Sequence, residues 1–398
     1  MSLEHLAWPF FDEKHRALAA AFADWTQAHL DDYESSEGND GVVARKIFAA
    51  LGESGWLRKT VPSERMPLAG AALDLRTLCL MREICANSSA IADVSLSEPW
   101  LGALAISIAA SRDLKNRYLA PYLRGNLLPA FALSEPDAGS DVAAIQTTAR
   151  LERDHYVLNG RKTWTSNAGL ADLYVVFARI DDGGDRGPIS AFAVEPNDGG
   201  LVLEERLRVL PPHSVGTWRL DDCRIPADRL LGQPGQGMAI ALSALELFRP
   251  TVGAAALGFA RRAMDEALMR SHIRTAFKKP IAEHQLVQAK LADMGVNVDA
   301  AALLVYRAAW AHDAGQADIG REASIAKLFS TEATQQVVDE ALQIFGGLGV
   351  VRGMATERLY RHVRAFRILD GTSEIQRLII ARSLLRQTAP RESGYSRA

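Results

Sequence analysis

The sequence contains few cysteines and little net charge, and each of these two properties excludes a class of protein. Its three cysteines, among 398 residues, are too few and too scattered for a disulfide framework or a zinc site. The formal net charge of −3 provides no electrostatic footprint for nucleic acid. A signal peptide and a run of about 18 apolar residues that could span a membrane are also missing. We therefore expect a cytoplasmic protein that binds neither nucleic acid nor a membrane.

Several motifs that identify enzyme classes are absent too. No G-x-G-x-x-G follows a strand-like segment, so a Rossmann dinucleotide site is not indicated. G-x-S-x-G, P-loop and H-E-x-x-H motifs are not found. The nine histidines are dispersed, and no metal site is predicted. What remains is a composition with 48% apolar and 23% charged residues, which is typical of a globular protein with a large core.

The chain changes character twice along its length. Apolar positions from Val287 to Ala309 step by four and three, as in one long amphipathic helix. Between strand-like flanks, the Asn159-Gly160 dipeptide predicts a β-hairpin. A helical domain, a β domain and a helical bundle in this order indicate an α+β fold rather than a βαβ alternation. The predicted domains are residues 1–128, 129–234 and 235–398.

Two polar segments in the β domain are candidates for chemistry. "FALSEPDAGSD", residues 131–141, combines hydroxyls, glycine and carboxylates where the helical region gives way to strands, although an ordinary polar loop would look the same. "NGRKTWTSNAGLAD", residues 159–172, places Trp164 beside Thr165 and Ser166. An indole next to hydroxyl donors could stack on a flat heterocycle and bond its edge. The alternative for Trp164 is a core residue of the sheet.

A third segment, "RILDGTSEIQRLIIARSLL", residues 367–385, carries a single carboxylate before an apolar helix. Ser373 and Gln376 have the spacing of a capping box, which predicts a helix start at this point. Asp370 then lies in an Asp-Gly turn just outside the helix N-terminus, where exposed N–H groups favour a negative charge. On these observations alone, Asp370 is either a turn residue or the group that performs the chemistry.

Together and in this order, these segments resemble the acyl-CoA dehydrogenase family of flavoproteins over nearly the whole chain. The resemblance implies an N-terminal helical domain, a central β-barrel or sheet domain and a C-terminal four-helix bundle. It also implies FAD as cofactor, with an acyl-CoA or acyl-carrier thioester as substrate. The segments that carry it are "ALSEPDAGSD", "LNGRKTWTSNAG", "RTAFKKPIAEHQ", "QIFGGLG" and "DGTSEIQRLIIAR".

The resemblance implies a role for residues at matching positions. The first segment lies against the flavin and contacts it through Phe131, Leu133, Ser134, Gly139 and Ser140. Ser140 is also expected near the thioester. Trp164 flanks the flavin ring with Thr165 beside it, and Ser166 bonds flavin N5. Pyrophosphate and adenine are held across a dimer interface by Arg274, Phe277, His284, Gln285, Gln343, Gly346 and Gly347, and the last helix meets FAD at Gly371, Thr372 and Glu374.

Asp370 falls where most of the family has its catalytic glutamate, and Arg249 and Arg382 match substrate-binding arginines. The implied reaction is α,β-dehydrogenation of the thioester, with Asp370 as base and flavin N5 as hydride acceptor. Aspartate is one methylene shorter than glutamate, so we expect a short, branched or alicyclic acyl group, with Trp100 limiting the depth of its pocket. Glu246, near the position of the base in some members, is not adopted as the base here.

Other departures leave alternatives open. "LPPHSVGTWRLDDCRIP", residues 210–226, replaces a family motif, and Ala276 replaces a usual FAD-contacting threonine. A nitroalkane-oxidase-like flavoprotein oxidase would also have an aspartate as base. A non-catalytic, DNA-associated flavoprotein would need a basic C-terminal extension. The family resemblance further implies an electron-transferring flavoprotein as electron acceptor and a homotetramer built as a dimer of dimers.

Overall fold

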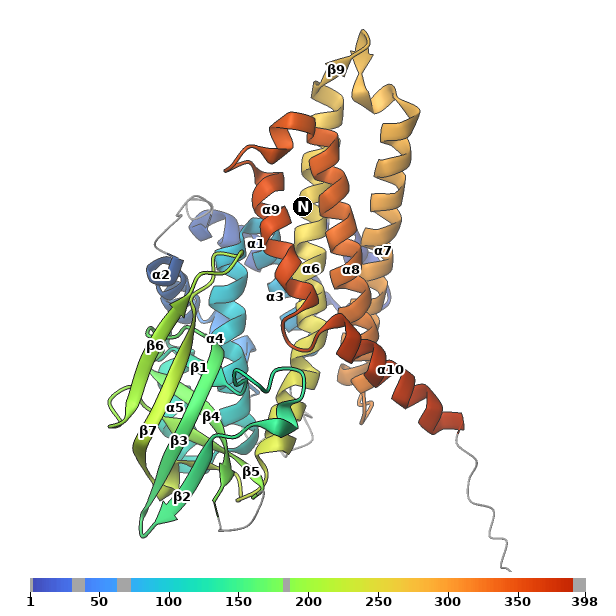
Figure 1. The fold of residues 1–398 in the computed structure, drawn as a ribbon. Coiled ribbons are helices and arrows are strands. Elements are labelled where there is room, and N and C mark those ends of the chain that lie inside the picture. Colours follow the sequence, from blue (N-terminus) through green and yellow to red (C-terminus); the bar gives the residue numbers. More distant parts are fainter. Residues whose placement is uncertain (1–2, 31–39, 63–72, 182–186, 389–398) are drawn as a thin grey trace, which may run out of the picture.

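The computed structural model describes residues 3–30, 40–62, 73–181 and 187–388. Within these ranges the chain runs through helices, then strands, then helices, which confirms the predicted fold class (Figure 1). Residues 389–398, the tail that bears on the DNA-associated alternative, lie outside the described residues.

Short polar side chains begin the helices of the N-terminal region. Asp74, Ser89 and Ser111 each accept a hydrogen bond from a backbone N–H in the first turn of the helix that follows. The apolar faces behind these caps pack into the main core of the molecule. The helices are α1 (Glu13–Leu30), α2 (Asp40–Glu53), α3 (Leu75–Ser88), α4 (Ala90–Ala109) and α5 (Arg112–Leu123).

Two helices, α4 and α6 (Gly237–Ile273), are long and apolar enough to cross a membrane by length and composition, which the sequence analysis did not anticipate. The most apolar window of α4 is 94% buried within the fold, and that of α6 is 78% buried. Burial in the core therefore accounts for their apolar composition.

The β domain is one sheet with the strand order β6-β7-β3-β2-β4-β5-β8, and β1 pairs in parallel with β4. Side chains on one face of the sheet form a second, smaller core. Its strands are β1 (Pro129–Ala132), β2 (Thr148–Glu152), β3 (His155–Ser166), β4 (Leu173–Ile180), β5 (Ile189–Val194), β6 (Leu201–Leu207), β7 (Val215–Pro226) and β8 (Leu230–Leu231).

The hairpin predicted at Asn159-Gly160 is wrong, because β3 runs through both residues. A Cβ on Gly160 would lie 2.4 Å from the Thr147 hydroxyl oxygen, so this glycine permits a close approach between chain segments rather than a turn. The turn between β2 and β3 lies earlier, where Glu152 pairs with His155 and Arg153 has a φ of 58°.

The C-terminal region is a bundle in which α6, α7 and α8 lie side by side, while α10 projects from it (Figure 1). The amphipathic pattern predicted from Val287 to Ala309 lies within α7, and the next long helix ends at Gly346, whose φ is 64°. Asp313 joins α7 to the N-terminal region by accepting a hydrogen bond of 2.7 Å from Nε of Arg76. The helices are α6, α7 (Gln285–Asp313), α8 (Gly320–Phe345), α9 (Ala355–Val363) and α10 (Ser373–Thr388).

Candidate active site

Asp370 lies in a tight turn between α9 and α10, as the Asp-Gly dipeptide predicts. Its φ is 54° and that of Gly371 is 94°, so both residues occupy a left-handed conformation that most side chains avoid. Lys327 of α8 supports the turn, because Nζ donates hydrogen bonds to the carbonyl oxygens of Phe366 (2.8 Å) and Gly371 (2.9 Å). The carboxylate is thus presented by a turn that a neighbouring helix holds from both sides.

The helix start was predicted correctly, but the capping box was not. α10 begins at Ser373, and the Thr372 hydroxyl accepts the hydrogen bond from the N–H of Ile375 (3.4 Å). Ser373 instead donates to Glu332 of α8 (2.6 Å), and the Gln376 amide donates to the Gly371 carbonyl (2.9 Å). A charged acceptor from another helix is a stronger partner for the serine than a local backbone N–H would be, and sequence spacing cannot reveal it.

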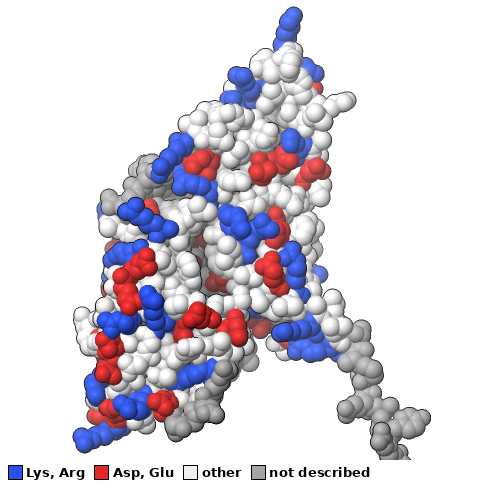
Figure 2. Space-filling model, viewed as in Figure 1, with Lys and Arg blue, Asp and Glu red and all other residues white. Residues whose placement is uncertain are grey.

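Burial, and after it the charge of Glu98, raise the pKa of Asp370, which lies at about 7. Positive charges on Lys327, Arg82 and Arg249 oppose this shift. Asp370 nevertheless keeps part of its accessible surface, so it lines a recess rather than a sealed core. Figure 2 shows a hollow between the β domain and the helical bundle. A carboxyl group that titrates near neutrality in a recess is suited to act as a general base.

Glu98 is a site residue that the sequence analysis missed. It lies on α4, and its Oε2 accepts a hydrogen bond of 2.8 Å from the Ser166 hydroxyl at the end of β3. A hydroxyl has one proton to donate, so the Ser166 proton predicted to bond flavin N5 is directed at Glu98 here. Burial raises the pKa of Glu98, while the bond from Ser166 and the charge of Arg82 oppose that rise. The signal that could have found it was a glutamate next to Pro99, in a helix that is apolar over most of its length.

Arg82 is fully buried near Asp370 and Glu98, but its guanidinium is paired with a third carboxylate, that of Asp93. Its guanidinium donates two hydrogen bonds to Asp93, of 2.9 and 3.0 Å, and a third of 3.2 Å to the Thr251 hydroxyl. It also lies over the ring of Phe248, 4.9 Å from the centroid. Asp93 therefore balances most of the charge that Arg82 brings to the site.

Trp164 is exposed rather than buried, so the alternative of a core tryptophan is wrong. Its side chain is 60% exposed and its φ is 57°, whereas Trp218 is the buried tryptophan of the sheet. Next to it, the Thr165 hydroxyl and the Asn167 amide nitrogen are buried without a hydrogen-bond partner among the described residues. An open indole face beside two orphaned polar atoms fits a flat, hydrogen-bonding ring such as a flavin.

The loop after β1 is fastened to β3 beside Trp164. Lys162 is fully buried, and its Nζ donates to Glu135 (2.7 Å) and to the Leu133 carbonyl (3.0 Å). The Thr163 N–H donates to the Ser134 carbonyl at 3.0 Å. Of the five predicted residues, Phe131 lies within β1, whereas Leu133, Ser134 and Gly139 belong to the loop tied to the strand that carries Trp164, and Ser140 follows them at its exposed end. A Cβ on Gly139 would meet no atom within 4 Å, which leaves open space above the loop.

A second set of predicted cofactor residues lies elsewhere in the chain. Arg274, Phe277, His284 and Gln285 surround the β9–β10 hairpin (Thr275–Ala276 and Lys279–Pro280), at the end of the bundle away from α10 (Figure 1). Phe277 is 90% exposed, and its ring meets that of His284 edge-on at 5.9 Å. Gln343, Gly346 and Gly347 lie at the end of α8 and are exposed. A single chain therefore does not bring these residues to Asp370.

The two predicted substrate arginines differ in position. Arg249 on α6 is buried, and its Nε has no partner among the described residues. Burial lowers its pKa, while the charges of Glu246 and Asp370 oppose that shift. Arg382 is exposed on the projecting helix α10. Glu246 accepts a hydrogen bond from the N–H of Ile319 (3.3 Å), before the start of α8.

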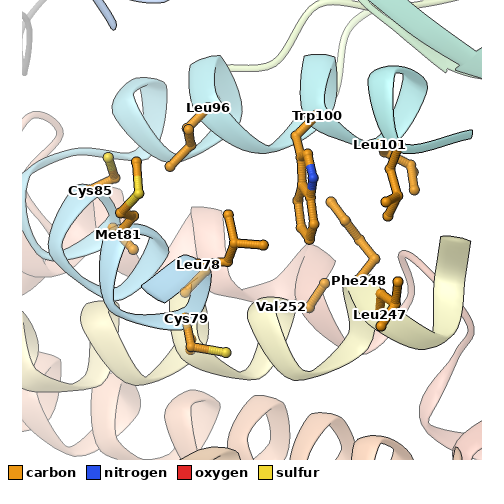
Figure 3. Packing of buried hydrophobic residues seen from close by; sticks show 14 of the residues in the cluster. Leu78, Cys79, Met81, Cys85, Leu96, Trp100, Leu101, Leu247, Phe248 and Val252 are labelled. Atoms are coloured by element: carbon orange, nitrogen blue, oxygen red, sulfur yellow. The ribbon is translucent and has the colours of Figure 1, made fainter. Parts of the chain in front are cut away.

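Trp100 closes the space between α4 and α6. Figure 3 shows its indole pointing from α4 toward Phe248 and Val252 of α6. Its ring centroid is 5.3 Å from that of Phe248, and its Nε1 has no partner among the described residues. A buried indole at this position limits the room beyond Glu98.

The segment that departs from the family motif also faces the site. His213, in the loop before β7, is partly buried, and its Nε2 has no partner among the described residues. Burial lowers its pKa to about 4, and the charges of Asp370 and Asp93 oppose that shift. The imidazole is therefore neutral at neutral pH.

The fold and the exposed indole beside β3 fit a flavin-dependent oxidoreductase. Family models for the acyl-CoA dehydrogenase N-terminal, middle and C-terminal domains match residues 12–126, 130–223 and 235–385. The chain belongs to the acyl-CoA dehydrogenase family, and it uses FAD to oxidise an acyl-CoA substrate.

Three similar proteins illustrate this relationship. The human mitochondrial short-chain specific acyl-CoA dehydrogenase is 39% identical over 94% of this chain and 90% of its own. A 3-(aryl)acrylate reductase from Clostridium sporogenes is 35% identical over 95% of this chain and 100% of its own. The crystal structure of an acyl-CoA dehydrogenase from Bacillus anthracis in complex with FAD has a TM-score of 0.87 and 31% identity, over 97% of this chain and 69% of that one.

Proposed function

We propose that this enzyme dehydrogenates a short, branched or alicyclic acyl thioester, with Asp370 as the base that removes the α-proton. The observation that carries the proposal is the burial of the Asp370 carboxyl in the recess beside the flavin-binding strand, which raises its pKa to about 7. An ordinary aspartate is too weak a base, while one with this pKa holds a proton and releases it near neutral pH.

Bound FAD supplies the acceptor for the hydride that leaves the β-carbon of the substrate. Trp164, Thr165 and Ser166 on one side and the loop from Phe131 to Ser140 on the other are the residues of this chain that would hold its ring. The α-C–H of a thioester is a very weak acid, so donors fixed around the carbonyl oxygen are required to stabilise the developing negative charge. The backbone N–H of Asp370 is our candidate for one of these donors, because it belongs to the same residue as the base and is therefore fixed relative to it.

The size of the base supports the proposed substrate class. Aspartate places its carboxylate about 1.5 Å further back than glutamate, by the length of one C–C bond. An α-branch or a ring displaces the α-carbon toward Asp370 and restores the reacting distance, which proton transfer requires. Trp100 and Phe248, packed at 5.3 Å, leave a shallow space for the far end of the acyl group.

The distant cofactor residues support an oligomer. Arg274 and Phe277 lie at the bundle tip, so they can serve a flavin only in another subunit (Figure 1). Apolar side chains near this tip are exposed, among them Ile273 at 70%, Phe277 at 90% and Leu286 at 80%. Association would cover them, in line with the homotetramer expected for the family. We propose an electron-transferring flavoprotein as the acceptor and the cytoplasm as the location.

The decisive experiment compares the native enzyme with Asp370→Asn under anaerobic conditions, using a panel of acyl-CoA thioesters and following flavin absorbance. We expect the variant to keep its FAD and to lose substrate-driven bleaching. Asp113→Asn, an exposed aspartate on α5, is the matched control and should bleach like the native enzyme. Bleaching of Asp370→Asn at the native rate would show that Asp370 is only a turn residue. Rapid peroxide release during turnover in air would favour the oxidase alternative, for which an aspartate base also speaks.

A further inference from the structure

A second carboxylate, Glu98, faces the site from α4 and is not required for α-proton removal. Its Oε2 accepts the Ser166 hydroxyl at 2.8 Å, whereas Oε1 accepts no hydrogen bond from the described residues. Arg82, whose charge acts on Glu98, already makes two hydrogen bonds to Asp93 and one to Thr251. Glu98 is only partly buried and Oε1 is not among the buried unpaired atoms, so this oxygen is open to water until a ligand covers it.

Two further polar atoms on the same turn of α4 also lack partners. The Ser97 hydroxyl and the Trp100 Nε1 are buried, and neither has a hydrogen-bond partner among the described residues. Trp100 is 1% exposed and lies against Phe248 in a part of the site that is otherwise apolar (Figure 3). Three incompletely paired polar groups within four residues make this wall suited to a polar ligand group rather than to a plain hydrocarbon.

We propose that Glu98 recognises a hydrogen-bond donor on the acyl chain, so that the preferred substrate is a hydroxyl- or amino-substituted short acyl thioester. The proposal rests on the proposed function, because it places the substrate between Asp370 and α4. An unsubstituted chain would cover Oε1 of Glu98 and remove it from water without replacing the lost hydrogen bond. A donor on the chain replaces that bond, and a site built this way rejects analogues that lack the donor.

The polar and charged groups around the pocket determine which kind of acyl substituent is preferred. Glu98 and Asp370 are acidic, and Asp93 balances the nearby Arg82. His213, the titratable group facing the pocket from the loop before β7, is neutral because burial lowers its pKa to about 4. Lys327 and Arg249 add positive charge near Asp370, so net charge alone does not decide the preference. Oε1 of Glu98 can accept a hydrogen bond from a hydroxyl or ammonium group, whereas a carboxylate on the acyl chain has no proton to donate to it.

The test uses two thioesters of equal size, 4-hydroxybutyryl-CoA and pentanoyl-CoA, in which a hydroxyl replaces the terminal methyl. Flavin reduction and binding are measured for the native holoenzyme, Glu98→Gln and Glu98→Leu. We expect the native kcat/KM to favour the hydroxyl substrate by roughly ten- to a hundredfold. Glu98→Gln should reduce this ratio and Glu98→Leu should reverse it, while glutaryl-CoA should be a poorer substrate of the native enzyme than pentanoyl-CoA.

Glu195→Gln is the matched control, since Glu195 is another partly buried glutamate, directly after β5, whose partners include Arg117 and Tyr118 of α5. It should leave the substrate ratio at the native value even if it changes stability. The proposal is overturned if the native enzyme prefers pentanoyl-CoA or glutaryl-CoA, or if the hydroxyl preference survives in Glu98→Leu with FAD bound. In those cases the proposed function stands if Asp370→Asn fails to bleach the flavin with any of the thioesters that the native enzyme uses. If no thioester reduces the native flavin, the proposed function fails and this proposal fails with it.

Discussion

Lys327 donates a hydrogen bond of 2.9 Å to the carbonyl oxygen of Gly371, the residue directly after the proposed base. A second bond from the same ammonium, of 2.8 Å, reaches the carbonyl of Phe366 on the other side of Asp370. Lys327 is fully buried, and burial lowers its pKa to about 8. One lysine thus both fixes the backbone of the turn and places a positive charge near the carboxyl group.

Lys327→Met should weaken the turn and make the base harder to ionise. Two carbonyls lose a charged donor, at a cost of about 2–4 kcal/mol in the free energy of unfolding. Because the charge of Lys327 lowers the pKa of Asp370, its removal raises that pKa above about 7. The rising limb of the pH profile of flavin reduction, measured by stopped flow, should therefore move to higher pH. Lys290→Met removes a lysine paired with Glu340 on the surface of the bundle and should leave the limb in place.

Asp370→Asn should become relatively more stable as pH rises. The folded-state pKa of Asp370, about 7, lies above its ordinary value of 3.8, so folding favours the protonated form. The native chain therefore has this stabilisation in full below about 4 and loses it as pH rises through about 7. Melting temperatures at pH 5 and pH 8 should show the variant gaining on the native enzyme at the higher pH. An unchanged difference between the two pH values would contradict the raised pKa.

Trp164→Ala should weaken FAD binding, whereas Trp218→Ala should lower the stability of the fold. Trp164 is 60% exposed, so its loss removes little packing, and we expect an unchanged melting temperature with weaker retention of FAD. Trp218 is 7% exposed and meets Tyr174 edge-on at 4.8 Å. Its replacement should cost about 3–5 kcal/mol of stability. Thermal shift assays and FAD titration separate the two, and equal FAD affinity for Trp164→Ala and the native enzyme would remove Trp164 from the cofactor site.

The sequence predicted those features that depend on local pattern. Helix periodicity located α7, and the Asp-Gly dipeptide located the turn that presents Asp370. Contacts between distant segments could not be predicted in this way. Ser373 donates to Glu332, 41 residues away, instead of capping its own helix. Glu98 becomes a site residue only because α4 lies against the end of β3, which places it beside Ser166.

Asn159-Gly160 shows why a local signal can mislead. The dipeptide is typical of a two-residue hairpin turn, yet here the glycine lies within β3 because Thr147 approaches its backbone too closely for any side chain. Trp164 shows the converse, since a tryptophan within a strand pattern is most often buried. A bulge between Lys162 and Thr165 turns this one outward, and only the strand register reveals it.

Asp370→Glu tests whether the length of the base selects the shape of the substrate. The added methylene advances the carboxylate by about 1.5 Å, toward the α-carbon of a straight chain. We expect the variant to shift its kcat/KM ratio from branched or alicyclic thioesters, such as 2-methylbutyryl-CoA, toward butyryl- and hexanoyl-CoA. Because φ at this position is 54°, glutamate is accommodated less easily than aspartate, and the melting temperature and FAD content must be checked first.

The ratio of rates for branched and straight substrates is the informative quantity, since a general loss of stability lowers both alike. A native enzyme that uses butyryl- and hexanoyl-CoA better than every branched or cyclic thioester would contradict the proposed substrate class. If Asp370→Glu leaves the ratio of kcat/KM for branched over straight thioesters unchanged, the length of the base does not select the shape of the substrate. That selection would then be assigned to Trp100 and Phe248. Trp100→Phe, which shortens the side chain that closes the pocket, would then be expected to admit longer chains at either base.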